Sequence, residues 1–217
     1  VGRVENGLFS DRELQAIDYS IRLTRGHYLF SRCWLLVEGE TEVHLMPLLF
    51  ELLGHSQDEV SFSVLEISQV IDKGEPLIKF AKSLGIEWFL MADGDNAGND
   101  YINRASNHLS PGEQLSDRAR QLAHADIEHE FWYNGYGGFI QNMVTDNRQR
   151  QIETEASGDD GKKTKLLIKA AIEQFGGKPA FAQALVNEVK KRGVKTIPQT
   201  IRDIVDHVVN LSTGQKS

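Results

Sequence analysis

The chain has 217 residues, 40% hydrophobic and 25% charged, which is the composition of an ordinary globular protein of one large domain or two small ones. No apolar run approaches the roughly 20 residues needed to cross a bilayer. The only cysteine, Cys33, excludes an internal disulfide and a cysteine-rich zinc site. The first residues lack both an initiator Met and a signal-peptide pattern, so we expect a cytoplasmic chain that is part of a longer protein.

Charge is distributed unevenly along the chain, although its net value is only −7. Residues 159–195 contain nine Lys or Arg and four Asp or Glu, a local balance of +5 that leaves −12 on the remainder. An acidic part that collects cations and a basic part that meets phosphates would suit a metal-dependent nuclease. Two solvated surfaces would give the same distribution, and charge alone favours that simpler interpretation.

Strands and helices are predicted to alternate in the first half of the chain. The expected elements are a helix over 10–25, a strand over 33–37, a helix over 41–53, a strand over 60–67, a helix over 76–85, a strand over 86–92 and a helix over 97–109. Ser10 and Glu13 have capping-box spacing, and Thr41 is the expected N-cap of the second helix. This alternation predicts a mostly parallel sheet flanked by helices.

The second half of the chain lacks the alternation of strands and helices. After about residue 138 no run is strand-like, and the polar residues 145–163 are expected to form a loop or linker. Helices are predicted over 164–175, 179–192 and 198–211. The chain therefore divides into an N-terminal helical segment at 1–27, a sheet-containing domain at 28–140 and a small helical domain at 141–217.

Acidic clusters follow two of the three predicted strands. Glu38 and Glu42 flank the turn after the first strand, and Asp93 and Asp95 follow the third, about fifty residues later. Sites in parallel α/β sheets form beyond the carboxyl ends of the strands, where gathered carboxylates repel one another unless cations separate them. Oxygen ligands of this kind suit Mg²⁺ or Mn²⁺. Any one acid could instead be a helix cap, but two such clusters together favour a metal site.

The segments Leu35–Gly39 and Met91–Asp95 together resemble the Toprim signature, a glutamate after the first strand and an Asp-x-Asp after a later one. The stretch Val37–Glu42 is most similar to the overcoming-lysogenization-defect (OLD) nucleases. In that family an N-terminal ATPase precedes the Toprim domain and a helical region follows it. The resemblance covers residues 30–135 well and the C-terminal helices loosely, so 28–140 is expected to be the Toprim catalytic domain.

The resemblance implies a role for each acid. Glu38 matches the Toprim glutamate, and Asp93 and Asp95 match the Asp-x-Asp pair. Glu42 matches an acid that the nuclease branch places in the next helix turn. These nucleases are expected to hold two divalent ions, Mg²⁺ or Mn²⁺.

Two ions need a further acidic ligand from elsewhere in the chain. Glu128 is the expected source and Asp126 the second choice, because both lie in the acidic stretch 126–130. The start of a surface helix would look the same in sequence.

A lysine from the helical region is also implied to reach the metal site, where it would neutralise charge that builds on the scissile phosphate. Lys178 fits the first turn of a helix, a position that favours phosphate. Lys162, Lys163 and Lys165 are rival candidates, and an ordinary surface lysine would look no different.

The predicted function is hydrolysis of DNA phosphodiester bonds by a Mg²⁺- or Mn²⁺-dependent endo- or exodeoxyribonuclease. An ATPase domain in the same longer chain, and a homo-oligomer formed through that remaining sequence, are expected partners. Two alternatives stay open: another Toprim chemistry of the topoisomerase or primase type, and a non-catalytic DNA-bridging module of recombination. Tyr133 and Tyr136 are the candidate nucleophiles for a topoisomerase, although a turn with aromatic packing explains them more simply.

Overall fold

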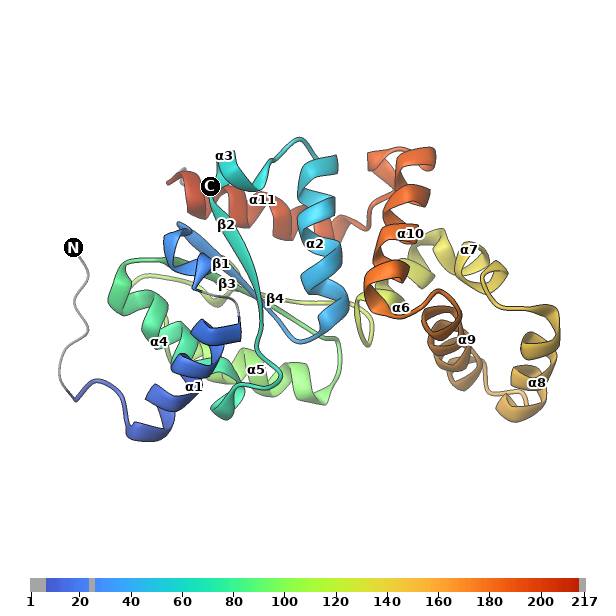
Figure 1. The fold of residues 1–217 in the computed structure, drawn as a ribbon, viewed down its shortest axis with the longest axis horizontal. Coiled ribbons are helices and arrows are strands. Elements are labelled where there is room, and N and C mark those ends of the chain that lie inside the picture. Colours follow the sequence, from blue (N-terminus) through green and yellow to red (C-terminus); the bar gives the residue numbers. More distant parts are fainter. Residues whose placement is uncertain (1–6, 24–25, 215–217) are drawn as a thin grey trace.

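Four parallel strands form the sheet around which the chain folds (Figure 1). In the computed structural model, which describes residues 7–23 and 26–214, their spatial order is β2-β1-β3-β4. The strands are β1 (Cys33–Val37), β2 (Phe62–Glu66), β3 (Glu87–Ala92) and β4 (Ala119–Gln121). The predicted parallel sheet flanked by helices is confirmed, and β4 is a strand that the sequence pattern missed because it has three residues.

The helices agree with the predicted positions through most of the chain. They are α1 (Asp11–Leu23), α2 (Glu40–Leu52), α3 (Gln57–Val60), α4 (Glu75–Leu84), α5 (Asn96–Ser106), α6 (Ile127–Phe131), α7 (Gly137–Asn142), α8 (Asp146–Ala156), α9 (Asp160–Gln174), α10 (Lys178–Arg192) and α11 (Gln199–Thr213). Shorter turns are η1 (His27–Phe30), η2 (Ile71–Gly74), η3 (Leu115–Asp117), the π-type η4 (Trp132–Tyr136) and η5 (Val194–Thr196). The predicted end of the first helix, at residues 24–25, lies outside the described residues.

The capping box at the start of α1 is confirmed. The backbone N–H of Ser10 donates to Glu13 Oε2 at 2.9 Å, and the N–H of Glu13 donates to Ser10 Oγ at 3.3 Å. Glu13 also accepts from Lys79 Nζ of α4 at 2.6 Å, and this bond lowers the pKa of Glu13 to about 2. The cap therefore also fixes α1 against α4.

The sheet separates two apolar layers because successive side chains of a strand point to opposite faces. On one face, Trp34 and Leu36 pack in a cluster with residues of α1, α4 and α5. On the other, Cys33, Leu35 and Val37 pack in a larger cluster with residues of α2, α6 and α8 to α11. All five side chains of β1 are fully buried, which is why this strand reads as a continuous apolar run.

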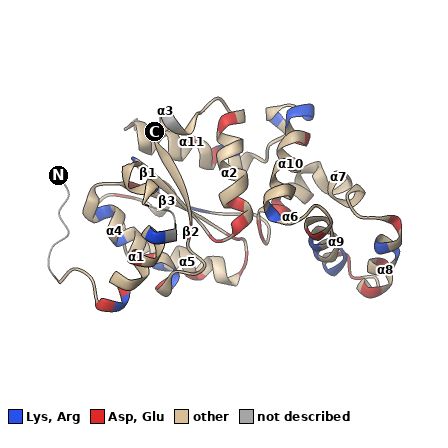
Figure 2. Ribbon diagram, viewed as in Figure 1, with Lys and Arg blue, Asp and Glu red and all other residues tan. Residues whose placement is uncertain are grey.

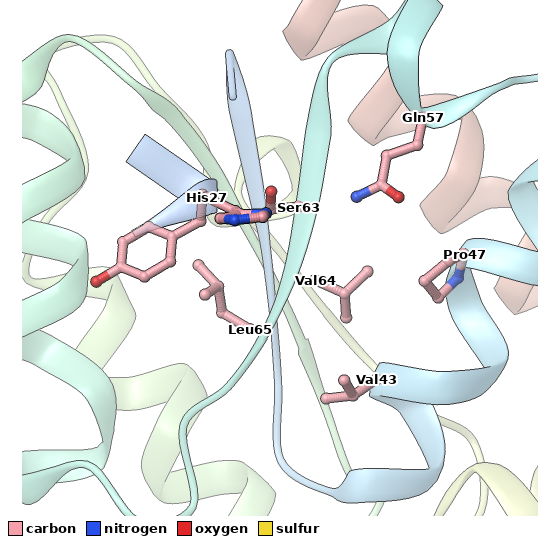
Figure 3. Close-up of a pocket in the computed structure, with 8 residues that line it drawn as sticks. His27, Val43, Pro47, Gln57, Ser63, Val64 and Leu65 are labelled. Carbon is pink, nitrogen blue, oxygen red and sulfur yellow. The ribbon is translucent and has the colours of Figure 1, made fainter. Parts of the chain in front are cut away.

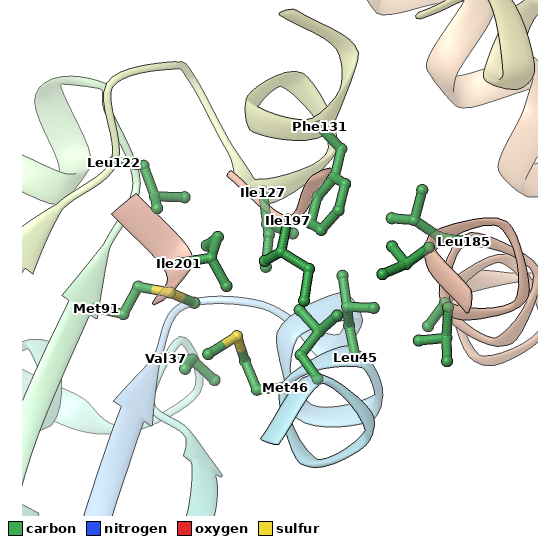
Figure 4. Packing of buried hydrophobic residues seen from close by; sticks show 14 of the residues in the cluster. Val37, Leu45, Met46, Met91, Leu122, Ile127, Phe131, Leu185, Ile197 and Ile201 are labelled. Carbon is green, nitrogen blue, oxygen red and sulfur yellow. The ribbon is translucent and has the colours of Figure 1, made fainter. Parts of the chain in front are cut away.

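The C-terminal helices share this larger core. Helix α10 packs along α2, and α11 returns to lie over β1 and β3. Figure 4 shows side chains from β1, α2, β3, α6, α10 and α11 gathered in the cluster. The predicted boundary between two domains near residue 140 stays a proposal. A division there would separate helices and strands that share one apolar core.

The prediction of a loop over residues 145–163 is wrong, because most of that segment is helical. Helix α8 is strongly polar and buries only Ile152 and Ala156, so it lacks the apolar periodicity that reveals a helix in sequence. Asp159 caps α9 by accepting from the N–H of Lys162 at 2.9 Å. The connection between the two helices is limited to three residues, beginning at Ser157 with a φ of 53°.

The outer strand β2 lies beside a shallow groove of about 220 Å³ (Figure 3). Its lining comes from β2, α2, η1 and α3 and comprises His27, Tyr28, Val43, Pro47, Gln57, Ser63, Val64 and Leu65. No predicted site residue lines this groove. Among the described helices, none combines the length and apolarity needed to span a membrane.

The shared core predicts that the helical part and the sheet unfold together. Leu185 of α10 is fully buried in this core, so Leu185→Ala is expected to lower the free energy of unfolding by about 2–5 kcal/mol. Leu14→Ala, on the exposed surface of α1, is the matched control and should change it little. Urea denaturation followed by circular dichroism measures both, and a separate low-stability transition for the variant would contradict a single cooperative unit.

Candidate metal centre

The acids after β1 and β3 lie side by side at the carboxyl edge of the sheet. The strand register places Val37 opposite Met91, so the chain leaves both strands at the same level. The backbone N–H of Asp93 donates to Glu38 Oε1 at 2.8 Å. The structure therefore brings together the two acidic clusters on which the predicted site depends.

Glu38 is half-buried at this edge. Burial raises the pKa of its carboxyl group, the hydrogen bond from Asp93 opposes that rise, and the negative charge of Asp95 adds to it. The ammonium group of Lys73 partly offsets the effect by favouring the ionised form.

Glu42 is buried one turn into α2. The predicted cap Thr41 is wrong, because α2 begins at Glu40 with Gly39 as its N-cap, which leaves Thr41 inside the first helical turn. The Thr41 hydroxyl instead donates to Glu128 Oε1 at 2.6 Å. Burial, and then the charge of Glu128, raise the pKa of Glu42 to about 8.

The glycines between the acids allow close approach of neighbouring groups. A Cβ on Gly39 would lie 2.7 Å from Glu42 Oε2, and one on Gly94 would lie 2.2 Å from the backbone oxygen of His124. Neither glycine has a positive φ, so the missing side chain, and not an unusual backbone conformation, explains both positions.

The pKa of the Asp93 carboxyl group lies far above its ordinary value. Burial, then the charges of Glu42 and Glu38, raise its pKa to about 9. From β4, the Gln121 side-chain amide donates to the backbone oxygens of Asp93 and Asp95 at 3.0 and 3.2 Å. The strand that the sequence pattern missed therefore fixes the backbone of the Asp-x-Asp turn.

Asp95 is exposed and acts as the N-cap of α5, where its Oδ1 accepts from the N–H of Gly98 at 2.8 Å. Asp95 does not line the cleft described below, whereas Asp93 does. Structural capping and metal binding are compatible for this residue, because the cap occupies one of its two oxygens.

The two candidates for the additional acid lie at the start of α6. Glu128 is buried, and burial together with the charge of Asp126 raises its pKa. Asp126 caps α6 by accepting from the N–H of His129 at 2.8 Å, and its Oδ1 lies 2.6 Å from Nδ1 of the same residue. Burial opposes ionisation of Asp126, but these bonds outweigh it and lower its pKa.

Four of the acids face the helical region across a cleft of about 410 Å³, which Glu38 and Asp95 do not line. One wall contains Gly39, Glu42, Asp93, Asp126, Glu128 and His129, and the other contains Lys165, Ile168, Lys169, Ile172, Glu173 and Lys178. Figure 2 shows acidic residues at the start of α2 and basic residues on α9 and at the start of α10. The sequence pattern did not reveal the supporting contacts of three residues. Thr41 contacts Glu128, His129 contacts Asp126, and Gln121 contacts the backbone of Asp93.

Lys178 lies where the sequence placed it, as the first residue of α10. It lines the cleft, and its charge lowers the pKa values of Glu42 and Glu128. Of its rivals, Lys165 also lines the cleft, whereas Lys162 donates to a backbone oxygen of α8 and Lys163 pairs with Glu153 of α8.

The two tyrosines considered as nucleophiles differ in accessibility. Tyr136 is fully buried, and its hydroxyl shares a hydrogen bond with Thr196 at 2.6 Å. Tyr133 is 54% exposed, and its ring packs against that of His124. Aromatic packing therefore accounts for both residues.

The donor set fits a hard divalent cation by its chemistry, since it consists of carboxylate oxygens that are partly buried and repel one another. Within the part of the chain that the structure describes, no three His, Cys, Asp or Glu side chains are already grouped to hold a metal ion. Glu38, Glu128, Asp126 and Asp95 instead have hydrogen-bond partners within the protein. Metal binding at these residues stays a prediction that requires some of these bonds to be exchanged for ligation.

Burial of the acids, together with repulsion among them, predicts how stability depends on pH without metal. Asp93 has a folded-state pKa of about 9 against an ordinary value of 3.8, so its contribution to stability is complete below about pH 4 and is lost as the pH rises towards 9. In EDTA, the melting temperature is expected to fall by several degrees between pH 6 and 9. Asp93→Asn should flatten this dependence, and an unchanged slope in the variant would contradict the assignment.

The close approach at Gly94 predicts that its replacement destabilises the site. Gly94→Ala places a methyl group against the His124 backbone, and we expect it to cost about 1–3 kcal/mol of unfolding free energy. Gly138→Ala is the matched control, because a Cβ there meets nothing within 4 Å in α7 and should be neutral or stabilising by up to about 1 kcal/mol. Urea denaturation distinguishes the two, and equal stability of both variants would disprove the steric argument.

Comparison with known proteins relates part of this chain to a known family. Residues 29–95 match the family described as overcoming lysogenization defect protein-like, TOPRIM domain. The chain is 31% identical to the uncharacterized protein YbjD of Escherichia coli strain K12 over 207 residues. This alignment covers 95% of this chain and 35% of YbjD. The chain thus spans about a third of the length of this curated relative.

Solved structures of the C-terminal regions of two OLD proteins share the fold. That of Burkholderia pseudomallei aligns with a TM-score of 0.64 and 21% identity, covering 84% of this chain and 99% of the other. That of Xanthomonas campestris pv. campestris aligns with a TM-score of 0.64 and 19% identity, covering 88% and 98%. Residues 29–95 thus match the OLD-like TOPRIM family, and the chain around them shares the fold of these OLD C-terminal regions.

Proposed function

We propose that this chain is the metal-dependent nuclease portion of a larger protein and that it hydrolyses phosphodiester bonds in DNA. The observation that carries the proposal is the cleft in which Glu42, Asp93 and Glu128 face Lys178. Phosphoryl chemistry needs two kinds of charge. The carboxylates supply one, because they are costly to ionise without a counterion and so favour a bound cation. The lysine across from them supplies the other. The OLD-like TOPRIM family supports the same chemistry.

The acids form two groups around Asp93, which is why we propose two Mg²⁺ or Mn²⁺ ions. The charge of Asp95 acts on the pKa of Glu38, whereas the charges of Glu128 and Asp126 act on that of Glu42. Bound divalent ions supply an activated water and stabilise the leaving oxygen. Asp93 is close enough to both groups for the charges of Glu42, Glu38, Asp126 and Glu128 to raise its pKa, and it would be a ligand in either group.

Other residues of the chain position these acids. Thr41 orients Glu128, His129 orients Asp126, and Gln121 holds the backbone of the Asp-x-Asp turn. Such supporting contacts set ligand orientation and typically influence metal affinity by 10–100-fold.

Lys178 binds the scissile phosphate and stabilises negative charge that develops on its oxygens. It stands at the N-terminus of the 15-residue helix α10, whose free N–H groups also favour an anion. Packing of α10 along α2 fixes this position relative to Glu42.

Lys165 and Lys169 extend the basic wall along α9. They lie four residues apart, about 6 Å of helix rise, and therefore present successive charges along one face. Contacts of this kind bind the nucleic-acid backbone and do not read its sequence. We accordingly propose DNA binding without strong sequence preference, in a cytoplasmic protein whose remaining sequence supplies an ATPase domain and an oligomer interface.

A cleavage assay tests the proposal. The chain should nick or degrade plasmid DNA in Mg²⁺ or Mn²⁺ and leave it intact in EDTA. Asp93→Asn should abolish cleavage, and Lys178→Met should lower kcat by about 10²–10³-fold. Asp100→Asn, on the exposed surface of α5, is the control that should retain activity.

Each alternative function gives a different result in the same assay. A covalent protein–DNA adduct would assign topoisomerase chemistry, and metal-independent binding without cleavage would assign a bridging module. Full activity of Asp93→Asn, with its fold intact by circular dichroism, would overturn the metal-site assignment.

A further inference from the structure

The loop after β2 has an unusual backbone. Asp72, Lys73 and Gly74 are consecutive residues with φ values of 50°, 54° and 78°. Left-handed conformations are disfavoured for residues with a Cβ, and two such residues in succession are uncommon. Strain of this kind persists only where surrounding contacts enforce it, and it concentrates at functional sites.

Contacts on both sides hold this loop in place. A Cβ on Gly74 would lie 3.0 Å from Cβ of Ile67, so the loop packs closely against the end of β2. Asp72 pairs with Arg104 of α5 at 3.9 Å, and the same guanidinium donates to Glu75 at 2.8 Å. The loop is thereby bound to the helix that Asp95 caps.

The strained backbone presents Lys73 to an aromatic face. Its Nζ lies 4.6 Å from the ring centroid of Tyr101, a residue of α5 that is 4% exposed. Among the residues that the structure describes, Lys73 has no ion pair, although carboxylates are close by. The strain therefore does not serve a salt bridge.

Lys73 and Tyr101 lie in the electrostatic neighbourhood of the acids. The charge of Lys73 acts on the pKa of Glu38, and burial followed by the charges of Glu38 and Asp93 raises the pKa of Tyr101 to about 12. The strand register agrees, because Val37 pairs with both Glu66 and Met91, so the loop that follows β2 leaves the sheet at the level of Glu38.

Lys73 and Lys178 approach this edge from opposite faces of the sheet. Tyr101, whose ring contacts the Lys73 ammonium group, belongs to the apolar layer of α1, α4 and α5. The cleft that contains Lys178 is bordered by α2, α6, α9 and α10, which belong to the other layer. The acids therefore lie between two lysines that the fold supplies independently.

We propose that Lys73 is a second phosphate-positioning residue, which binds a backbone phosphate of the nucleic-acid strand on the side of the acids opposite Lys178. This inference rests on the proposed function, because it takes nucleic acid as the ligand of the same edge. The Tyr101 ring holds the ammonium group near the acids without occupying a carboxylate oxygen. Lys73 remains free to contact a phosphate.

The first test compares Lys73→Met and Lys73→Arg with Lys82→Met, a matched control on α4 whose lysine contacts only the His108 backbone oxygen among the described residues. Binding of a fluorescein-labelled oligonucleotide is measured by anisotropy in EDTA and in Ca²⁺ over a series of salt concentrations. Lys73→Met should weaken binding and reduce the magnitude of the salt slope by about 0.7–0.9, the value of one lost phosphate contact. Lys73→Arg should restore the slope, and Lys82→Met should leave it unchanged.

Cleavage kinetics and stability distinguish positioning from a structural role. Lys73→Met should raise KM about tenfold while kcat changes less than about twofold, because the lost contact is made equally in the ground and transition states. Lys73→Gly should bind DNA as weakly as Lys73→Met, yet melt about 2–4 °C higher than the wild type because it relieves the left-handed strain.

The outcomes separate this inference from the proposed nuclease. If Lys73→Met binds and cleaves like the wild type, the role of Lys73 is overturned and the nuclease stands. The same holds if Lys73→Met changes only the affinity for Mn²⁺ measured by calorimetry, since Lys73 would then balance the charge of the acids. If the wild type binds without cleaving and Lys73→Met loses the contact, the inference survives the failure of the nuclease. A wild type that neither binds nor cleaves overturns both.

Discussion

The burial of mutually repelling carboxylates at one edge of the sheet is the constraint on which the rest of this structure depends. Asp93 and Glu42 are raised to pKa values of about 9 and 8 by burial and by neighbouring negative charge, so the ionised cluster opposes folding. The contacts around it hold the acids where solvation and repulsion would disperse them: the Asp93 N–H on Glu38, the Thr41 hydroxyl on Glu128, and the Gln121 amide on the Asp-x-Asp turn. A fold that tolerates this arrangement must gain its stability elsewhere.

That stability comes from a core that extends beyond the sheet. The β1 side chains are fully buried on both faces, and the larger apolar cluster continues through α2 into α10 and α11. This continuity also matters for the site, because α10 carries Lys178 on its first residue and packs along the helix that carries Glu42. The position of the lysine relative to the acid is therefore set by helix packing and not by a flexible connection.

The sequence predicted those parts of the fold and site that depend on local pattern. The apolar runs of β1 and β3 are each followed directly by acids in the sequence. Pairing of the two strands then brings Glu38 to Asp93, so the pattern predicts this contact. What failed depends on partners distant in sequence. Strand β4 is too short to show periodicity, and α8 is too polar. The sequence predicts Thr41 as a helix cap because its hydrogen-bond partner, Glu128, lies 87 residues away. Lys73 carries no motif, and only its left-handed backbone and its contact with Tyr101 single it out.

Among the described lysines that lie near the acids, only Lys169 pairs with a carboxylate, because its Nζ lies 3.9 Å from Glu173 Oε1. Lys73, Lys165 and Lys178 lie close to the acids, yet in the described parts of the chain none of them has an ion pair with a carboxylate. A lysine paired directly with Glu42 or Asp93 would neutralise the charge that attracts a divalent cation and would compete with it for the same oxygens. Lysines at the rim avoid that conflict, because they favour an incoming phosphate while the carboxylates between them keep their affinity for cations. Lys73 is held over the Tyr101 ring by a strained backbone. This arrangement keeps its positive charge near the carboxylates without a direct ion pair that would neutralise them.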